Sequence, residues 1–384
     1  MERLTGVIPK YSKNGSTRMK VGIFTFPDTT SYGATLQMCA LYRTVKELGH
    51  EPELVNYQNR WMKEGRHTSA MQNRSRCSRW LKRKASALLH LRMHLGFRRF
   101  ENEMKKYPKR PASDKGMLFE IGKRYDAVVC GSDQVWNPDI TGRDLSYFLD
   151  FCGLETDRIS YAPSFGVESL PQTFGEAAKK ELLRFSHISV REEAGQNIIR
   201  ELTGREAQLV IDPTLLLDSQ EWTTYEKAHP SAKGEYILFY TVRTANDTLW
   251  RYCRNLAKKC NLKILRIGGN IITKKTKNEN GVEYICDASP EEWLYLVHNA
   301  KYVVTNSFHG TAFAINYRKD FFVEFSSLTN SRLSQIVNML GLEAQIVKGE
   351  EAVLPLKTDY SHTEKVLPQL RMESLRFLQQ AFVE

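Results

Sequence analysis

A short turn in the second half of the chain carries the residue best suited to move a proton. Residues 303–311 (VVTNSFHGT) have the pattern of an apolar strand, a polar turn and the start of a helix. His309 can donate or accept a proton near neutral pH. Ser307, Gly310 and Thr311 surround it, and free N–H groups from Thr311 onward would face an anion, helped by the helix dipole. We predict an anion-binding catalytic turn here; the alternative is that His309 only caps the helix.

Three cations are candidates to complete this anion site. Arg191 directly follows the apolar stretch 187–190 and precedes two acids. A guanidinium at the carboxyl end of a strand suits a phosphate or carboxylate through a bidentate fork. The alternative is that Arg191 pairs with a neighbouring glutamate and holds the helix start. Lys319 and Arg332 come after the His309 helix, and each either completes the pocket or is a surface charge.

A second polar cluster follows the apolar strand predicted at 125–130. Asp133 can act as a base or hydrogen-bond the hydroxyls of a sugar, and Trp136 can stack on the apolar face of a sugar ring. The alternative is that Asp133 caps a turn and Trp136 belongs to the core. The first βα turn would line the same cleft. The candidates for contacts with a polar ligand are Tyr32, Gly33, Gln134, Trp136 and Asn137.

Several common chemistries lack their sequence signatures. No G-x-G-x-x-G follows the first strand, which disfavours NAD or FAD, and there is neither a P-loop nor a G-x-S-x-G nucleophile elbow. His90 and His94 are four residues apart but stand among arginines, so we predict no metal site. The seven scattered cysteines form no C-x-x-C pair, which argues against a disulfide framework or a structural zinc. We expect no cofactor.

The elements that must position these residues follow a doubled α/β rhythm. Strands at 20–26 and 53–57 flank an amphipathic helix that Gly49 would end, which is a Rossmann-like opening. A second series starts with the strand at 236–242. We predict a flexible extension at 1–18, Rossmann-like domains at 19–214 and 215–362, and a helix in 363–384 that packs back on the first domain. Two such domains facing across a cleft form a GT-B-like fold.

The positive charge of the chain is local. The 384 residues carry a net charge of +11, whereas residues 60–110 alone hold 16 Lys or Arg against three Glu, a balance of +13. We interpret this segment as a basic helical arm. It is either a solvated amphipathic helix or a surface for anionic lipid headgroups or a lipid-diphosphate-linked substrate. Nucleic acid is disfavoured because no aromatic RNA-binding platform or zinc finger is present.

Nothing in the sequence predicts a membrane span or a signal peptide. No apolar run reaches about 18 residues, and residues 1–20 lack an apolar core and a small-residue cleavage site. We therefore expect a cytoplasmic protein, either free or peripheral at the inner face of the membrane.

Motifs along nearly all of 19–345 resemble those of the polysaccharide pyruvyl transferase family. Their order in the chain makes the resemblance more specific than any single motif. They lie at 21–37 (VGI…SYGATLQ), 125–137 (YDAVVCGSDQVWN), 159–166 (ISYA…SFG), 188–192 (ISVRE), 212–216 (DPTLL) and 301–310 (KYVVTNSFHG). The resemblance implies a GT-B-like fold and transfer of a pyruvyl unit from phosphoenolpyruvate to two hydroxyls of a sugar. The products would be a pyruvate ketal on a surface glycan or its precursor, and phosphate.

The resemblance also implies roles for the candidate residues. His309 would protonate the methylene carbon or the leaving phosphate, and Asp133 would stabilise positive charge or activate a hydroxyl. Arg191, Lys319 and the amides of 310–313 would bind the donor, which is a co-substrate. The acceptor sugar would be free or lipid-linked. Many family members carry an arginine two residues before the histidine; here that position is Ser307, and we expect Arg332 to substitute.

Two other functions remain open at this level. One is a GT-B glycosyltransferase that uses a nucleotide sugar, although we find no clear ribose-binding glutamate or base-stacking pocket in the second domain. The other is a non-catalytic glycan-assembly protein at the membrane surface that keeps the fold and uses the basic arm.

Overall fold

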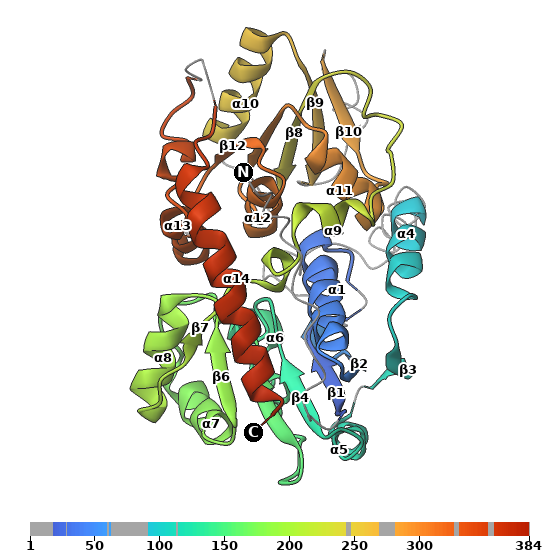
Figure 1. The fold of residues 1–384 in the computed structure, drawn as a ribbon, viewed down its shortest axis with the longest axis vertical. Helices are drawn as coiled ribbons and strands as arrows, with labels where there is room; N and C mark the ends of the chain where they lie inside the picture. The colour runs from blue at the N-terminus through green and yellow to red at the C-terminus, as the bar shows by residue number, and fades with distance from the viewer. Residues whose placement is uncertain are drawn as a thin grey trace, which may run out of the picture.

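The chain folds into two lobes, one above the other in Figure 1, each built around a parallel sheet. The computed structural model describes residues 18–27, 29–59, 61–62, 91–112, 114–242, 247–268, 281–325, 330–351 and 357–383. The predicted N-terminal extension up to residue 17, and residues 63–90 of the predicted basic arm, lie outside the described residues.

The first sheet has seven strands in the order β3-β2-β1-β4-β5-β6-β7, all paired in parallel. The strand order reverses between β1 and β4, which makes a topological switch point where such sheets bind ligands. The strands are β1 (Lys20–Phe24), β2 (Glu51–Tyr57), β3 (Lys106–Ala112), β4 (Ala127–Cys130), β5 (Asp157–Ser160), β6 (His187–Val190) and β7 (Gln208–Leu209).

The second sheet repeats this pattern with five parallel strands in the order β10-β9-β8-β11-β12. Its switch point lies between β8 and β11. The strands are β8 (Tyr236–Thr241), β9 (Lys263–Gly268), β10 (Val282–Ile285), β11 (Tyr302–Thr305) and β12 (Asp320–Val323). Two Rossmann-like domains stacked in this way confirm the predicted GT-B-like fold.

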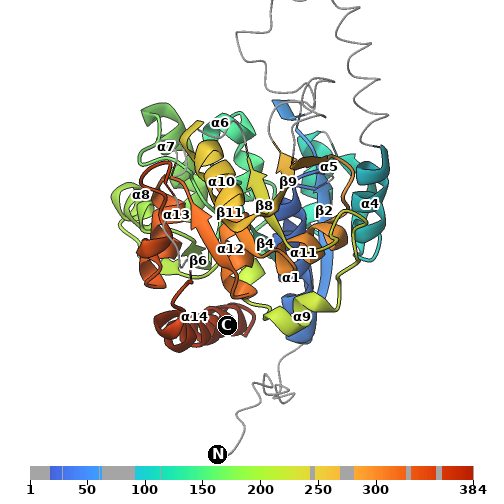
Figure 2. The same ribbon diagram turned by 90° about the horizontal axis from the view of Figure 1, so that it is seen from above.

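Helices cover the sheets and connect their strands (Figures 1 and 2). Several begin with the signals that the sequence carries: Ser31 caps α1, and Ser289 forms a capping box with Glu292 at the start of α11, with Pro290 as the first helical residue. The longer helices are α1 (Tyr32–Glu47), α4 (Leu91–Glu101), α5 (Lys115–Gly122), α7 (Gln172–Leu182), α8 (Glu193–Thr203), α10 (Asp247–Cys260), α11 (Pro290–His298), α12 (Phe308–Asn316), α13 (Asn330–Met339) and α14 (Ser361–Ala381). Short helical turns are α6 (Pro138–Thr141), η2 (Leu145–Phe148), η3 (Pro213–Leu215), α9 (Ser219–Thr223) and η5 (Glu343–Gln345).

The described part of the predicted basic arm is not a single helix in solvent. Helix α4 packs on the second domain, where Gly96 lies against Ser289 at the start of α11. Arg92 pairs with Asp287 at 2.7 Å and also with Glu292. Beyond α4, the prediction of helix is wrong, because residues 106–112 form β3 at the edge of the first sheet. Ion pairs made by a basic residue of α4 therefore help to join the two domains.

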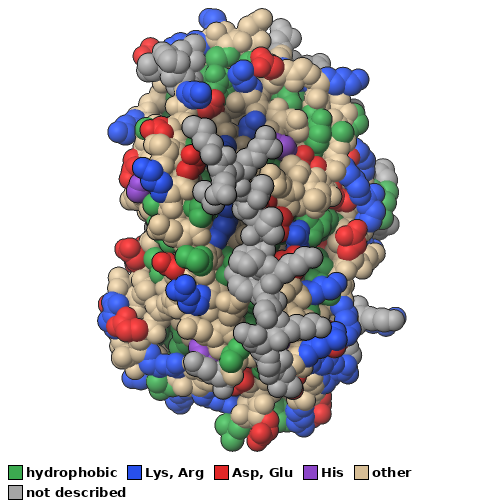
Figure 3. Space-filling model, viewed as in Figure 1, with side chains coloured by type: hydrophobic (Ala, Val, Ile, Leu, Met, Phe, Trp, Pro, Cys, Tyr) green, Lys and Arg blue, Asp and Glu red, His purple; other side chains and the backbone are tan. Residues whose placement is uncertain are grey.

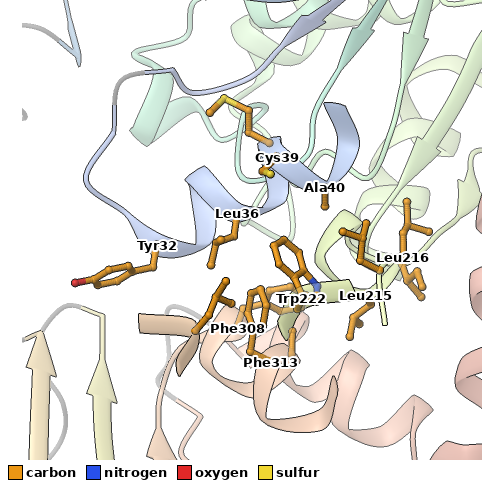
Figure 4. Close-up of a cluster of buried hydrophobic side chains, with 14 of the residues drawn as sticks. Tyr32, Leu36, Cys39, Ala40, Leu215, Leu216, Trp222, Phe308 and Phe313 are labelled. Atoms are coloured by element: carbon orange, nitrogen blue, oxygen red, sulfur yellow. The ribbon is translucent and has the colours of Figure 1, made fainter. Parts of the chain in front are cut away.

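A shared aromatic core joins the two lobes. Figure 4 shows helix α1 of the first domain above α12 of the second, with Trp222 from the connecting segment between them. Trp222 is fully buried and meets the ring of Phe313 edge-on at 5.0 Å. Tyr32 stacks on Trp293 with 5.3 Å between ring centroids. Because burial of large aromatic rings is a dominant stabilising contribution, this core fixes the relative position of the domains.

Helix α14 crosses from the second domain to the first (Figure 1). Near its start, the Thr363 hydroxyl donates to the carbonyl of Leu340 at 2.9 Å. Near its end, the Ser374 hydroxyl accepts from the amide of Ile211 at 3.1 Å, and Phe382 packs on His50. The helix thus ties the domains together at the side opposite α4. None of the helices in the described ranges is long and apolar enough to cross a membrane.

Charge on the face seen in Figure 3 is mixed. Lys and Arg side chains and Asp and Glu side chains are spread over both lobes on this face. This agrees with a basicity that belongs to one segment of the sequence rather than to the whole molecule.

Candidate active site

A cleft of about 670 Å³ opens where the two switch points face each other. Its walls come from the segments that follow β1, β4, β8 and β11, and from α13. The carboxyl ends of strands at a switch point are where open α/β sheets bind ligands, so both domains direct their binding edges into one space. The lining residues are Phe26, Pro27, Thr29, Thr30, Ser31, Ala34, Gln58, Met62, Asp133, Gln134, Ile140, Val242, Ser307, Phe308, His309 and Arg332.

The predicted catalytic turn is the first turn of α12. Ser307 is the N-cap, and its hydroxyl accepts from the amide of Gly310 at 3.2 Å. The amide of Thr311 donates to the carbonyl of Ser307 at 2.9 Å. The helix therefore starts at Phe308, three residues earlier than the sequence suggested, and the amides of Gly310 and Thr311 are already used within the turn. The first-turn donors left to an anion are those of Phe308 and His309.

Gly310 and Thr311 contribute packing to the site, because their amides are bonded within the turn and are not available to an anion. A Cβ at Gly310 would collide with the hydroxyl of Thr305 and come within 2.9 Å of the Tyr240 ring, so glycine lets the helix seat against β8 and β11. Thr311 is fully buried, and it is not among the residues that line the cleft.

His309 is held between the two domains. It is nine-tenths buried and lines the cleft. The Nδ1 edge of its ring lies against Gly33, where any Cβ would overlap the imidazole. On the other edge, Nε2 lies 3.7 Å from Oδ2 of Asp212. The predicted Gly33 therefore does belong to the site, through the histidine that it accommodates.

Behind His309 lies a buried ion-pair cluster centred on Asp212. The carboxylate accepts from Nη1 of Arg191 at 2.7 Å. Burial by itself would raise the pKa of Asp212, but the adjacent His309 and Arg191 charges and the amide of Thr214 hold this pKa well below its usual range. The carboxylate is therefore ionised at any working pH.

Arg191 does not reach the surface of the cleft. Its side chain is 2% exposed, and its guanidinium lies over the Phe308 ring at 4.5 Å and 3.9 Å from the carboxylate of Asp133. Phe308 and Asp133 line the cleft, so Arg191 lies directly behind these two lining residues. Burial would lower the pKa of Arg191, but the nearby carboxylates raise it, and Nε and Nη2 have no hydrogen-bond partner among the described residues. A buried guanidinium with unused donors is a strong attractor for an anion.

Asp133, Gln134 and Arg332 form the remaining polar wall. Asp133 has a φ of +74°, which is uncommon for a residue with a side chain and typical of functional turns. Arg332, on α13, is 6% exposed. The side-chain amide of Gln134, oriented to satisfy its neighbours, accepts from both terminal nitrogens of Arg332, at 3.0 and 3.1 Å. Arg332 thus lines the same cleft as Ser307, the position at which the sequence lacks the expected arginine.

Four further predicted residues lie outside the cleft. Tyr32 is in the aromatic core and donates to the carbonyl of Ala288 at 2.9 Å. Trp136 is fully buried and stacks on Phe148, which is the core alternative of the sequence analysis. Asn137 caps α6. Lys319 follows the far end of α12, where its amide donates to the carbonyl of Ala314, and burial lowers the pKa of its amine.

Other residues of the site were not predicted from the sequence. Thr29, Thr30 and Ser31 give the first βα turn a row of hydroxyls, and Phe26 and Met62 add an apolar wall. Asp212 lay near the end of the predicted first domain and in the motif at 212–216, but no role in the site was predicted for it. The available signal was its place directly after the stretch 208–211, at the carboxyl end of a strand.

Comparison with solved structures supports the fold alone. A protein from Listeria monocytogenes described as a UDP-N-acetylglucosamine 2-epimerase superposes with a TM-score of 0.51, at 10% identity, covering 95% of this chain and 91% of that one. The UDP complex of MnaA from S. aureus gives 0.50 at 12% identity, covering 94% and 90%. Comparison with curated proteins gives no match.

The family is decided by sequence. The model of the family described as polysaccharide pyruvyl transferase matches residues 32–323, most of the chain and both domains. This range includes the first turn of α1, the Asp133 loop, the Asp212 cluster and His309. The chain therefore belongs to the polysaccharide pyruvyl transferase family.

Proposed function

We propose that this protein transfers a pyruvyl unit from phosphoenolpyruvate to two hydroxyls of a sugar in a surface glycan or its precursor, forming a ketal and releasing phosphate. The observation that carries the proposal is that His309, in the first turn of α12, and Arg332, on α13, line the same cleft. The donor carries a phosphate and a carboxylate. A guanidinium, a histidine and the open amides of a helix start are the groups that such a doubly anionic molecule needs.

The residues fit the order of bond changes. A proton adds to the methylene carbon of the donor, and a sugar oxygen bonds to the central carbon. The bond from that carbon to the phosphate oxygen then breaks. The second sugar oxygen bonds to the same carbon, so that one hydroxyl proton balances the new methyl group and the other leaves with phosphate. His309 is the proton donor, and Asp133 either stabilises positive charge at the central carbon or receives a hydroxyl proton.

We place the acceptor against the first domain. The α1 side of the cleft offers the hydroxyls of Thr29, Thr30 and Ser31, and Phe26 and Met62 add apolar surface to the same cleft. Polar groups facing an apolar wall suit a sugar, which has hydroxyl edges and an apolar ring face. The proposed donor side and acceptor side meet at His309 and Asp133.

The first test is thermal stability with and without ligand. Phosphoenolpyruvate at about 100 times its Kd should stabilise the native chain by about 2.7 kcal/mol. Arg332→Met should lose most of this stabilisation, while Arg200→Met, which removes an exposed pair with Glu206 far along α8, should keep it. A shift with a UDP- or GDP-sugar and none with phosphoenolpyruvate would favour a glycosyltransferase. No shift with any of these ligands would favour a non-catalytic assembly protein.

We further propose a cytoplasmic enzyme that contacts the inner face of the membrane through α4. Leu91 and Leu95, one turn apart on this helix, are 50% and 55% exposed, and basic residues are dense in the sequence around them. We expect sedimentation with vesicles that contain anionic lipid, weakened by salt and by Leu91→Ser with Leu95→Ser. Equal binding to neutral and anionic vesicles would contradict this contact.

A further inference from the structure

The best-satisfied buried charge near the cleft belongs to a residue that touches neither proposed substrate. The side chain of Asp212 is fully buried, and it is not among the residues that line the cleft. Its Oδ1 accepts from the amide and the hydroxyl of Thr214 at 3.0 and 2.7 Å. Its Oδ2 accepts from Arg191 at 2.7 Å; the Ser132 hydroxyl, 3.1 Å away, donates over the shorter distance of 2.8 Å to the carbonyl of Ala162. Three donors, two from Thr214 and one from Arg191, fix this carboxylate in one orientation.

The same Oδ2 also faces His309. Nε2 of His309 lies 3.7 Å away, within ion-pair range, and has no hydrogen-bond partner among the described residues. Gly33 closes the opposite edge of the ring. The imidazole is therefore held between a fixed carboxylate and a backbone surface, and Asp212 is the group placed to receive the Nε2 proton.

The charged and titratable groups near His309 come from both domains. Asp133 follows β4 and Arg332 lies on α13, and both line the cleft with His309. Arg191 lies behind Phe308, and the Tyr240 ring lies against Gly310. Of the carboxylates Asp133 and Asp212, the one within ion-pair range of His309 is Asp212.

We propose that Asp212 is the positioning residue of this site, a buried carboxylate that orients the His309 ring from behind and fixes which of its two nitrogens carries the proton of the neutral ring. The proposal rests on the function proposed above for His309. It also has a structural meaning, because His309 belongs to the second domain and Asp212 ends the first. The contact exists only while the domains are docked, so the acid is completed by the domain interface.

The effect of pH on the stability of the fold follows from the direction in which folding shifts the pKa of Asp212. A carboxyl whose pKa is lowered on folding contributes stability above its unfolded pKa of about 3.9, and this contribution is lost as the pH falls below that value. Near neutral pH the charge of Asp212 is therefore constant.

The test is nuclear magnetic resonance of the histidine rings, with the His309 signals identified by their loss in His309→Gln. In the native chain, the neutral His309 ring should carry its proton on Nε2, facing Asp212. In Asp212→Asn, the share of the Nε2-protonated tautomer should fall, because the carboxylate that favours a proton on that nitrogen is lost. Asp212→Glu should restore most of the native behaviour.

Glu192→Gln is the matched control, since it removes a buried carboxylate that lies 3.7 Å from Arg191 in the same cluster. It should leave the His309 tautomer nearly unchanged. A neutral ring protonated on Nδ1 in the native chain would overturn the proposal, and so would the same tautomer distribution in Asp212→Asn and native protein. If Asp212→Asn fails to fold, the tautomer in the native chain still decides. These measurements need neither substrate, so a failure of phosphoenolpyruvate to bind would count against the proposed function alone.

Discussion

Two helices begin at the cleft, one from each domain, and their first turns differ in a useful way. Both are capped by a serine, Ser31 for α1 and Ser307 for α12. The α1 turn has an exposed cap and neighbouring hydroxyls in the cleft, although the residues that follow the cap are buried. The α12 turn has a buried cap, carries His309 and shares the cleft with Arg332. One fold thus supplies a neutral hydrogen-bonding turn and a cationic turn across the same cleft, which matches a sugar on one side and an anion on the other.

The largest effect should follow from removing the proton donor of the cationic turn. His309→Gln should lower kcat by about 10²- to 10⁴-fold, the usual contribution of a positioned acid. The assay is phosphate release from phosphoenolpyruvate with a polysaccharide fraction of the producing cell. His362→Gln, at the exposed start of α14, should retain activity. Retained turnover in His309→Gln with native melting behaviour would refute the assignment.

The next largest effect should come from disturbing the contact between Gly33 in the α1 turn and His309 in the α12 turn. Gly33→Ala should displace the His309 ring and lower kcat by roughly 10- to 100-fold, because small misplacements of a catalytic group are costly. Gly153→Ala is the control, since a Cβ there meets nothing within 4 Å. If both variants turn over at the native rate, His309 does not depend on its contact with α1.

Loss of the cation beside the α12 turn should weaken donor binding more than chemistry. Arg332→Met should raise the KM for phosphoenolpyruvate by about 10- to 100-fold, which corresponds to a charged hydrogen bond of roughly 1.5–3 kcal/mol. The KM for the sugar should change less. An equal loss for both substrates would argue that Arg332 shapes the whole cleft, through its contact with Gln134, rather than the donor side.

The smallest expected effects concern the caps themselves. Ser307→Ala should reduce the free energy of unfolding by about 1–2 kcal/mol, because the cap is buried and bonds Gly310 at 3.2 Å. Ser31→Ala should cost less, because its hydroxyl is exposed and its contact with Ala34 is 3.5 Å long. Urea titration of both variants measures the difference. A larger loss for Ser31→Ala would contradict the comparison of the turns.

Much of the fold could be read from the sequence because it depends on local patterns. Apolar runs of strand length, serine caps and Gly49 placed most elements within a few residues, and the doubled βα rhythm predicted two domains. Residues 106–112 were missed as a strand because KYPKRPA is basic and contains two prolines; it is tolerated at the edge of the sheet. β10 and its pairing with β9 were also not predicted.

The site was less predictable because its contacts cross between domains. His309, Asp133, Gln134, Ser307 and Arg332 were expected at the cleft and are found there. Nothing local in the sequence could show that Tyr32 turns into the aromatic core while its neighbour Gly33 meets His309. Nor could spacing show that Asp212 and Arg191, 21 residues apart, form one buried pair behind the wall.

The central claim is that the α12 turn holds the donor and the α1 turn holds the sugar. A crystal structure with bound phosphoenolpyruvate tests it most directly. We expect the phosphate or the carboxylate within hydrogen-bond distance of Arg332 and of the first amides of α12, with the methylene carbon facing His309. Phosphoenolpyruvate bound against Thr29, Thr30 and Ser31 instead, or outside the cleft, would contradict the claim.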